Sequence, residues 1–505
     1  MRVISRERHS RSEFLRRCGW VALSTTSLAL AACGGGGGGS DQPSSPVNPP
    51  PPPPPANTAP TAQAGTDQTI EWPTASAQLT GSGTDADAGQ TLTYAWTGPA
   101  GVTFSAAAAA ATNVTFPSAG SYTLTLTVGD GTANATDTVT VVVSPAVYPA
   151  SDVSNDQPDH GWTRAAAADV GLNDTALAEA ETYALTGGGS GMIVRKGRLV
   201  RSWGNTEQRY DMKSTTKSMG GIALGLALGA NSLALTDLAQ SRLPTVGNPT
   251  ANQPTWLTQV TVQQLATHSA GFAKPGGYVD QLYQPGTTWS YSDAGLNWLA
   301  ELLTTVLAQD LSAVLTTQVW TPLGLNSSAG GTQNTDGPPI SDIHWRNNVL
   351  RPTSTSRELA SGIYSNANAM ARVGLLFLRK GVWGETRILP ESFVTTVSTP
   401  PAANATMQNP DAANFPSATT NYGMLWWTNS GGLLANVPRD TFWAWGLGDS
   451  LIVVIPSLDI VAVRAGPQAA AGSSPGARVW NDDDWNGDYN VLAPFLQPIV
   501  RAATP

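Results

Sequence analysis

Ser214 and Lys217 lie three positions apart in the stretch Ser-Thr-Thr-Lys, so a helix that carries both places a hydroxyl and an amine on one face. A serine hydroxyl is a poor nucleophile at neutral pH. A nearby amine can accept its proton when burial or a neighbouring cation lowers the pKa of that amine. The chain has five lysines, and only Lys217 follows a serine at this distance. The pair indicates nucleophilic catalysis, although an ordinary capped helix start has the same sequence.

Acyl transfer through a serine also needs a group that protonates the leaving group and N–H donors that hold the oxyanion. Tyr291 stands at the start of a helical pattern. A phenol beside a lysine ammonium is biased toward its anion, which suits Tyr291 to carry a proton. A strand that begins near Ser450 is expected to bring a backbone N–H opposite that of Ser214. The sequence thus offers a candidate for each role.

Helical and strand patterns alternate around these residues, with strands at both ends and helices between them. Helices are predicted over 175–185, 219–230, 293–307 and 366–380, and strands over 191–195, 198–203, 451–455 and 458–464. The first two strands form a hairpin that turns at Lys196 and Gly197. This order predicts an α+β domain over 146–505.

Several collinear stretches make this domain resemble the penicillin-recognising serine hydrolases, which include class C β-lactamases, D-alanyl-D-alanine peptidases, family VIII esterases and 6-aminohexanoate-dimer hydrolases. The stretches are Tyr210 to Ser218, Leu265 to Gly271, Gln284 to Gly286, Tyr291 to Asp293, Trp320 to Leu325, Ser361 to Ser365, Tyr422 to Trp427 and Trp445 to Ser450. The resemblance implies an antiparallel sheet flanked by helices plus an all-helical region. It also implies that Ser214 is acylated, Lys217 is the base and Tyr291 protonates the leaving group. The amides of Ser214 and Ser450 would hold the oxyanion.

Two substrate-binding positions depart from the family pattern. Asp293 stands where asparagine is common, and the third motif, usually Lys-Thr-Gly or His-x-Gly, aligns with Leu447, Gly448 and Asp449. Asp449 would repel a substrate carboxylate, so esters and uncharged amides are favoured over penicillins and stem peptides. Tryptophans 426, 427, 443 and 445 are expected to line an apolar pocket or to pack in the core. A β-lactamase, a D-Ala-D-Ala carboxypeptidase and a non-catalytic binding or sensing module remain the alternatives.

Residues 57–145 have a different pattern, with short alternating segments rich in Thr, Val and Tyr that are separated by Gly, Asn and Asp turns. The stretches Pro60 to Gln68, Leu79 to Asp85, Tyr94 to Trp96 and Gly120 to Leu124 resemble a PKD-type, immunoglobulin-like β-sandwich. The resemblance implies a core role for Trp96. We expect a spacer, or a module with weak polysaccharide or protein contacts.

The N-terminus predicts export. Six arginines precede an apolar stretch from Gly19 to Ala32 that is too short to span a bilayer, and Leu30-Ala31-Ala32-Cys33 resembles a bacterial lipobox. Residues 1–33 are therefore predicted to be a lipoprotein signal with Cys33 lipidated, followed by a Gly/Pro-rich linker over 34–56. We expect an outer-membrane anchor facing the periplasm or the cell surface, with the Sec and Tat routes both open. The net charge of −9 argues against nucleic acid as a partner, and no metal or cofactor is implied.

Overall fold

The computed structural model describes most of the chain after its N-terminal segment. The described residues are 56–72, 75–87, 89–154, 157–247, 254–274, 281–329, 342–347, 356–466 and 489–503. Cys33 and the rest of the predicted signal lie outside these residues, so export and lipidation stay predictions.

The N-terminal folded part is built from strands, as predicted. They are β1 (Thr61–Gln63), β2 (Gln68–Glu71), β3 (Ser76–Thr80), β4 (Ser82–Thr84), β5 (Thr93–Thr97), β6 (Thr103–Phe104), β7 (Ala111–Thr115), β8 (Gly120–Gly129) and β9 (Asn134–Ser144). A sheet of order β2-β9-β8-β5 and a sheet of order β3-β7-β6 enclose one core, beside the pair β1-β4. Trp96 is 3% exposed in that core, which confirms its predicted packing role.

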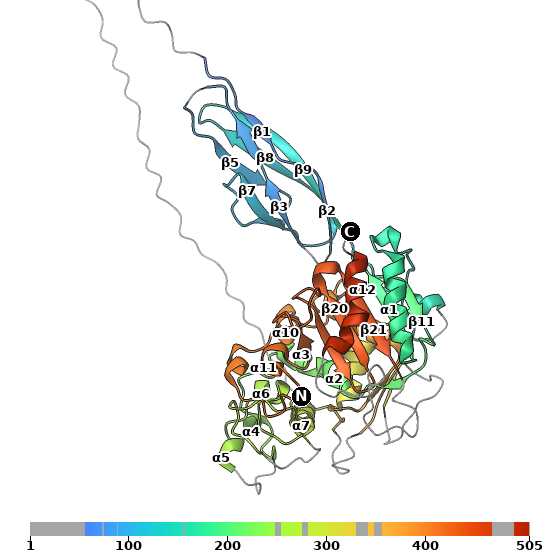
Figure 1. Cartoon of the computed structure of the whole chain (residues 1–505). Coiled ribbons are helices and arrows are strands. Elements are labelled where there is room, and N and C mark those ends of the chain that lie inside the picture. The colour runs from blue at the N-terminus through green and yellow to red at the C-terminus, as the bar shows by residue number, and fades with distance from the viewer. Residues whose placement is uncertain are drawn as a thin grey trace, which may run out of the picture. The chain divides into compact units, whose positions relative to one another are not determined.

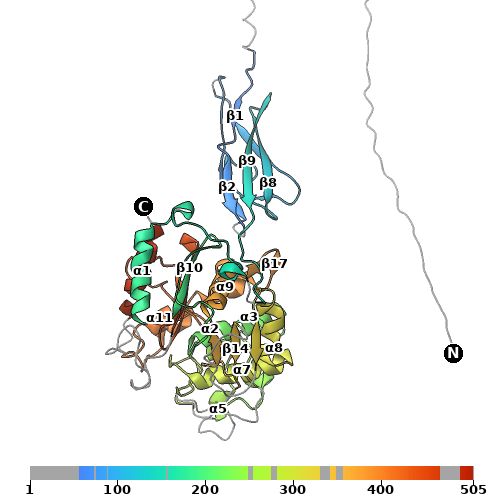
Figure 2. The same ribbon diagram turned by 90° about the vertical axis from the view of Figure 1, so that its right-hand side faces the viewer.

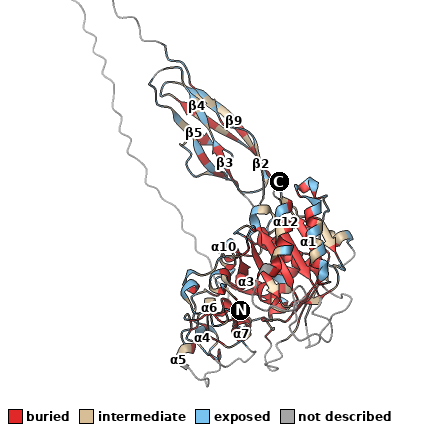
Figure 3. Cartoon of the chain, viewed as in Figure 1, coloured by how far each residue is buried: buried red, intermediate tan, exposed pale blue. Residues whose placement is uncertain are grey.

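The C-terminal part is organised by a six-stranded sheet of order β11-β10-β21-β20-β19-β18 (Figure 1). Its strands are β10 (Ser190–Arg195), β11 (Arg198–Trp203), β18 (Trp427–Thr428), β19 (Phe442–Gly446), β20 (Ser450–Ile455) and β21 (Ile460–Ala465), all paired antiparallel. The predicted hairpin is confirmed, since β10 and β11 join at Lys196 and Gly197, both with positive φ. Figure 3 shows these central strands as largely buried.

Helices cover both faces of this sheet because its side chains alternate between two hydrophobic cores. Ile452 and Val454 pack with α9 (Ala367–Leu378), whereas Leu451 and Val453 share the other core with α1 (Asp174–Thr186) and α12 (Ala493–Ala503). Figure 2 shows α1 and α9 beside β10. Helices α1 and α9 lie within two residues of their predicted bounds.

A second, mainly helical region carries the remaining elements. Its helices are α2 (Thr215–Gly220), α3 (Ile222–Gly229), α4 (Ala239–Arg242), α5 (Pro254–Leu257), α6 (Val262–Ala266), α7 (Asp293–Leu307), α8 (Leu311–Leu315), α10 (Glu391–Val397) and α11 (Ala418–Asn421). Its strands are β12 (Tyr210–Asp211), β13 (Ser327–Ala329), β14 (Ile343–Trp345) and β15 (Ile363–Ser365), with the small hairpin β16 (Val382–Trp383) and β17 (Thr386–Arg387). Helix α7 has its predicted bounds.

The prediction of a single helix over 219–230 is wrong, because the helical segment begins earlier and is divided in two. The chain forms α2 and α3 instead, with a break at Gly221, where a Cβ would lie 2.3 Å from a side-chain atom of Leu425.

Among the described residues, no single helix has the length and hydrophobicity to cross a membrane; α7 and the segment Leu311–Trp320 pass that test only together, as a pair bent by 69°.

Candidate active site

Ser214 precedes the first residue of α2, and two threonine hydroxyls fix that helix in place. The Oγ1 of Thr215 donates to the carbonyl of Ser450 at 2.6 Å, and the Oγ1 of Thr216 accepts from the amide of Ile363 at 3.0 Å. Both threonines are fully buried. The start of α2 is therefore tied to β20 on one side and to β15 on the other, which sets the position of Ser214.

Lys217 lies one helical turn after Ser214 and is only 2% exposed. Its Nζ donates to Ser214 Oγ at 2.9 Å, to Asp293 Oδ1 at 2.9 Å and to the carbonyl of Ala360 at 2.7 Å. The same nitrogen lies 4.8 Å from the ring centroid of Tyr291. The structure thus brings together Ser214, Lys217 and Tyr291 as predicted, and it adds Asp293 to this group.

The charge state of Lys217 differs from the expectation. Burial lowers the pKa of its amine, but the carboxylate of Asp293 and the phenol of Tyr291 outweigh burial, and the net result is a raised pKa. Lys217 is therefore an ammonium in the resting state. The expected lowering is wrong because Asp293 is an anion, where an asparagine would be neutral.

Aromatic rings hold Tyr291 in place. Its ring stacks on Phe415, with centroids 4.7 Å apart and planes at 16°, and lies 4.4 Å from the ring of His268. The Nδ1 of His268 accepts from the amide of Ser292 at 3.1 Å. Burial, Lys217 and Lys274 keep the pKa of His268 well below its usual range, so this imidazole is neutral. His268 packs against Tyr291 and fixes the chain that follows it.

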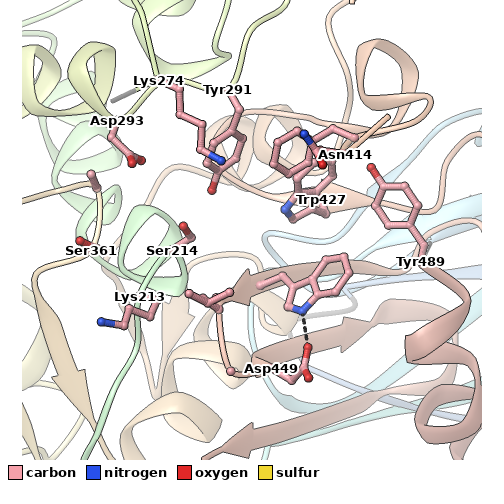
Figure 4. A pocket seen from close by; sticks show the side chains of 16 residues that line it. Lys213, Ser214, Lys274, Tyr291, Asp293, Ser361, Asn414, Trp427, Asp449 and Tyr489 are labelled. Atoms are coloured by element: carbon pink, nitrogen blue, oxygen red, sulfur yellow. Dashed lines mark hydrogen bonds between the residues drawn. The ribbon is translucent and has the colours of Figure 1, made fainter. Parts of the chain in front are cut away.

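A cavity of about 260 Å³ opens beside Ser214 (Figure 4). Its lining includes the predicted Ser214, Tyr291, Asp293, Trp427, Trp445, Gly448 and Asp449. Residues to which the sequence assigned no role also line it, among them Lys213, Lys274, Ser361, Asn414, Phe415 and Tyr489. Lys213 and Ser361 lie within the stretches that carry the family resemblance, whereas the other four lie outside them and no spacing rule points to them. Trp426 and Trp443 are buried in the two cores and do not line the cavity.

The structure does not place Ser450, the predicted oxyanion donor, on the wall of the cavity. Ser450 is fully buried, pairs with Gly446 across the β19–β20 turn and is not among the residues that line the cavity. The turn residues Leu447, Gly448 and Asp449 do line it. The part of the hairpin beside Ser214 is therefore the turn before β20, three residues earlier than expected.

Asp449 lines the cavity, and its carboxylate contacts Trp445. The residue is 1% exposed, and its Oδ1 accepts from the indole Nε1 of Trp445 at 3.0 Å.

No group of three or more His, Cys, Asp or Glu side chains within the described ranges is arranged to hold a metal ion.

Comparisons with known proteins find distant likenesses. One curated relative, an uncharacterised protein of Alkalihalophilus pseudofirmus, is 22% identical over 297 residues, covering 55% of this chain and 83% of its own. A structure described as a β-lactamase from Bacteroides dorei is 13% identical, covers 66% of this chain and 98% of its own, and has a TM-score of 0.48. A structure described as a 6-aminohexanoate-dimer hydrolase of Bacillus anthracis is 17% identical, covers 55% and 73%, and has a TM-score of 0.43.

Two family models match the chain. A PKD domain model matches residues 64–143, within the predicted sandwich. The beta-lactamase model matches residues 174–466, which is more than half of the chain and contains Ser214, Lys217 and Tyr291. The chain belongs to the beta-lactamase family, which has a serine hydrolase fold, and it carries a PKD-like domain before the matched residues 174–466.

Proposed function

We propose that this protein cleaves uncharged esters or amides through an acyl-enzyme on Ser214. The observation that carries the proposal is the contact of 2.9 Å between Lys217 Nζ and Ser214 Oγ, beneath a cavity that Tyr291 also lines. A hydroxyl, an amine and a phenol at these distances are the groups that acyl transfer requires.

Acylation begins when Ser214 Oγ attacks the substrate carbonyl and its proton moves to Lys217 Nζ. Because Lys217 is an ammonium at rest, only the protein molecules in which this amine has already lost a proton can carry out this step. The Asp293 carboxylate, 2.9 Å away, stabilises the ammonium, so the neutral amine becomes abundant only as the pH approaches the raised pKa of Lys217. Tyr291 then gives a proton to the leaving group and recovers one from Lys217. In deacylation, a water molecule attacks the acyl carbonyl, and the same groups return the proton to Ser214.

The negative charge that develops on the carbonyl oxygen needs two N–H donors. One is the amide of Ser214, and we assign the other to the amide of Leu447. A Cβ on Gly446 would lie 2.1 Å from the carbonyl oxygen of Met212 and 3.0 Å from the amide nitrogen of Thr215, so the end of β19 packs against the turn that carries Ser214. Leu447 follows directly and lines the cavity.

Labelling with a fluorophosphonate probe tests the chemistry. We expect the wild type to be labelled and Ser214→Ala to lose labelling. Ser361→Ala is the matched control: Ser361 also lines the cavity, but its hydroxyl donates to Glu358 Oε1 at 2.6 Å, and labelling should persist. A folded wild type that resists the probe would instead support the non-catalytic binding module.

A second candidate, a β-lactamase or D-Ala-D-Ala carboxypeptidase, is favoured by one observation. Lys274 lines the cavity with its Nζ 5.6 Å from the ring centroid of Tyr291, where an ammonium can attract a substrate carboxylate. The rate on nitrocefin compared with that on p-nitrophenyl butyrate separates the two candidates. Faster hydrolysis of the ester supports the first proposal, and faster hydrolysis of nitrocefin supports the second.

A further inference from the structure

We infer that Asp449 is a positioning residue for the indole of Trp445, and that this indole selects substrates with an uncharged, apolar substituent next to the scissile bond. The inference rests on the proposed function of Ser214 and assigns a role to the carboxylate in the third motif. It replaces the view of Asp449 as a charge that repels substrate.

The first support is the contact of Asp449 itself. Its Oδ1 accepts from Trp445 Nε1 at 3.0 Å, a bond that Figure 4 draws as a dashed line ending on Asp449. Trp445 lies in β19, and Asp449 lies in the turn that follows it. Asp449 has a φ of 55° and is 1% exposed. A buried acceptor aimed at an indole N–H restricts the rotation of the ring, because the alternative leaves a buried polar group without its bond.

The second support is the guanidinium that lies behind the turn. Arg464 is fully buried and donates to the carbonyls of Gly448 at 2.7 Å and Asp449 at 3.0 Å. It also donates to the carbonyl of Gly187 at 2.7 Å, which ties the turn to the end of α1. Burial lowers the pKa of Arg464 to about 10, while Asp449 acts to raise it. Arg464 therefore fixes the backbone of the turn that carries Asp449, and its positive charge interacts favourably with that carboxylate.

The third support is the surface that Trp445 completes. The ring of Tyr489 lies 5.9 Å from Trp445 and 5.5 Å from Trp427, and Phe415 lies 5.9 Å from Trp427 at 19°. All four side chains line the cavity beside Ser214. Burying an apolar substituent of the substrate against such a continuous aromatic surface lowers the free energy of binding, whereas burying a carboxylate there does not. We name the residues Phe415, Trp427, Trp445 and Tyr489 the aromatic wall.

Steady-state kinetics on p-nitrophenyl acetate, butyrate and hemiglutarate test the inference. Asp449→Ala removes the acceptor, and we expect the KM for the butyrate to rise about tenfold while the kcat and the KM for the acetate stay within about twofold. Asp449→Asn keeps an oxygen acceptor without the charge and should restore the KM for the butyrate. Trp445→Phe should behave as Asp449→Ala does. Trp426→Phe changes a buried tryptophan outside the cavity and should leave all three esters unaffected.

Two results would overturn the inference. One is equal impairment of Asp449→Ala and Asp449→Asn, which would make the charge the essential feature. The other is an unchanged KM for the butyrate in Asp449→Ala together with a selective gain on the hemiglutarate. A separate measurement does not depend on turnover: the Kd of p-nitrophenyl butyrate for Ser214→Ala, from quenching of tryptophan fluorescence. Adding Asp449→Ala to this variant should raise that Kd about tenfold. Fluorophosphonate labelling reports on Ser214 alone, so a failure of the proposed chemistry is distinguishable from a failure of this inference.

Discussion

The ammonium of Lys217 donates three hydrogen bonds, to a hydroxyl, a carboxylate and a carbonyl. The carboxylate is that of Asp293, at a position where the family commonly has asparagine. An ion pair at this distance favours the charged form of the lysine, although burial acts against it. At the residue scale, we therefore expect Asp293 to set how much of the protein holds the neutral amine that the proposed acylation requires.

Asp293→Asn should move the rising limb of the pH–rate profile to lower pH. The folded protein has a raised Lys217 pKa because Asp293 stabilises the ammonium. Removing that carboxylate lowers the pKa of the amine, and the neutral form becomes abundant at a lower pH. The measurement is kcat/KM for p-nitrophenyl butyrate across the pH range, since this quantity reports on the free enzyme.

Glu391→Gln is the matched control for Asp293→Asn. It removes the carboxylate from another lysine pair, Lys380 Nζ to Glu391 Oε1 at 2.9 Å, which is exposed and does not line the cavity. Its pH–rate profile should coincide with that of the wild type. A profile of Asp293→Asn that moves to higher pH, or that does not move, would show that Lys217 is not the group that titrates in this limb.

At the element scale, the parts that the sequence predicts well are those with a local pattern. Helix α7 repeats apolar residues at helical spacing, and β10 and β11 flank a turn at Lys196 and Gly197, so their bounds follow from neighbouring residues. These bounds need no knowledge of distant contacts. The joining of Ser214, Lys217 and Tyr291 in one site is different, because its prediction rests on the resemblance to a known family.

The predictions that differ from the structure depend on distant contacts. The shift from Ser450 to the turn before it follows from the three-residue turn that joins Gly446 to Ser450, which motif alignment does not reveal. The raised pKa of Lys217 follows from Asp293, which lies 76 positions away. The packing of Phe415 against Tyr291 joins two loops, and no periodicity reports on such a contact.

Gly446→Ala should cost activity because β19 and the turn before α2 touch at this residue. The added Cβ would lie 2.1 Å from the carbonyl oxygen of Met212, and neither backbone segment can yield alone, since Thr215 also binds the carbonyl of Ser450. We expect kcat for p-nitrophenyl butyrate to fall about a hundredfold, in the range for the loss of one oxyanion donor. Gly295→Ala is the control: its Cβ would meet atoms no closer than 3.5 Å within α7. That variant should keep full activity and gain about 0.5–1 kcal/mol of stability. Equal values of kcat for the two variants would show that the turn after β19 does not contribute to catalysis.

At the scale of the whole molecule, the chemistry belongs to the C-terminal part of the chain. Every described residue that lines the cavity lies between Lys213 and Tyr489, and none of these belongs to the PKD-like domain. That domain has a core of its own around Trp96. We therefore propose that it serves as a spacer or as a module for weak polysaccharide or protein contacts, while the N-terminal segment determines where the enzyme is held.

Cys33→Ser tests the proposed anchor. The chain has two cysteines, Cys18 and Cys33, and only Cys33 completes the lipobox-like stretch. Expressed in a Gram-negative bacterium, the wild type should fractionate with membranes, incorporate labelled palmitate and leave the membrane with detergent, because acyl chains supply the binding free energy. Cys33→Ser should incorporate no palmitate, whereas Cys18→Ser should behave as the wild type. Fluorophosphonate labelling of Ser214 should persist in both variants, because both cysteines are far from Ser214 in the sequence. Palmitate on Cys33→Ser, or a wild type without palmitate, would contradict the lipoprotein assignment and leave the proposed chemistry of Ser214 standing.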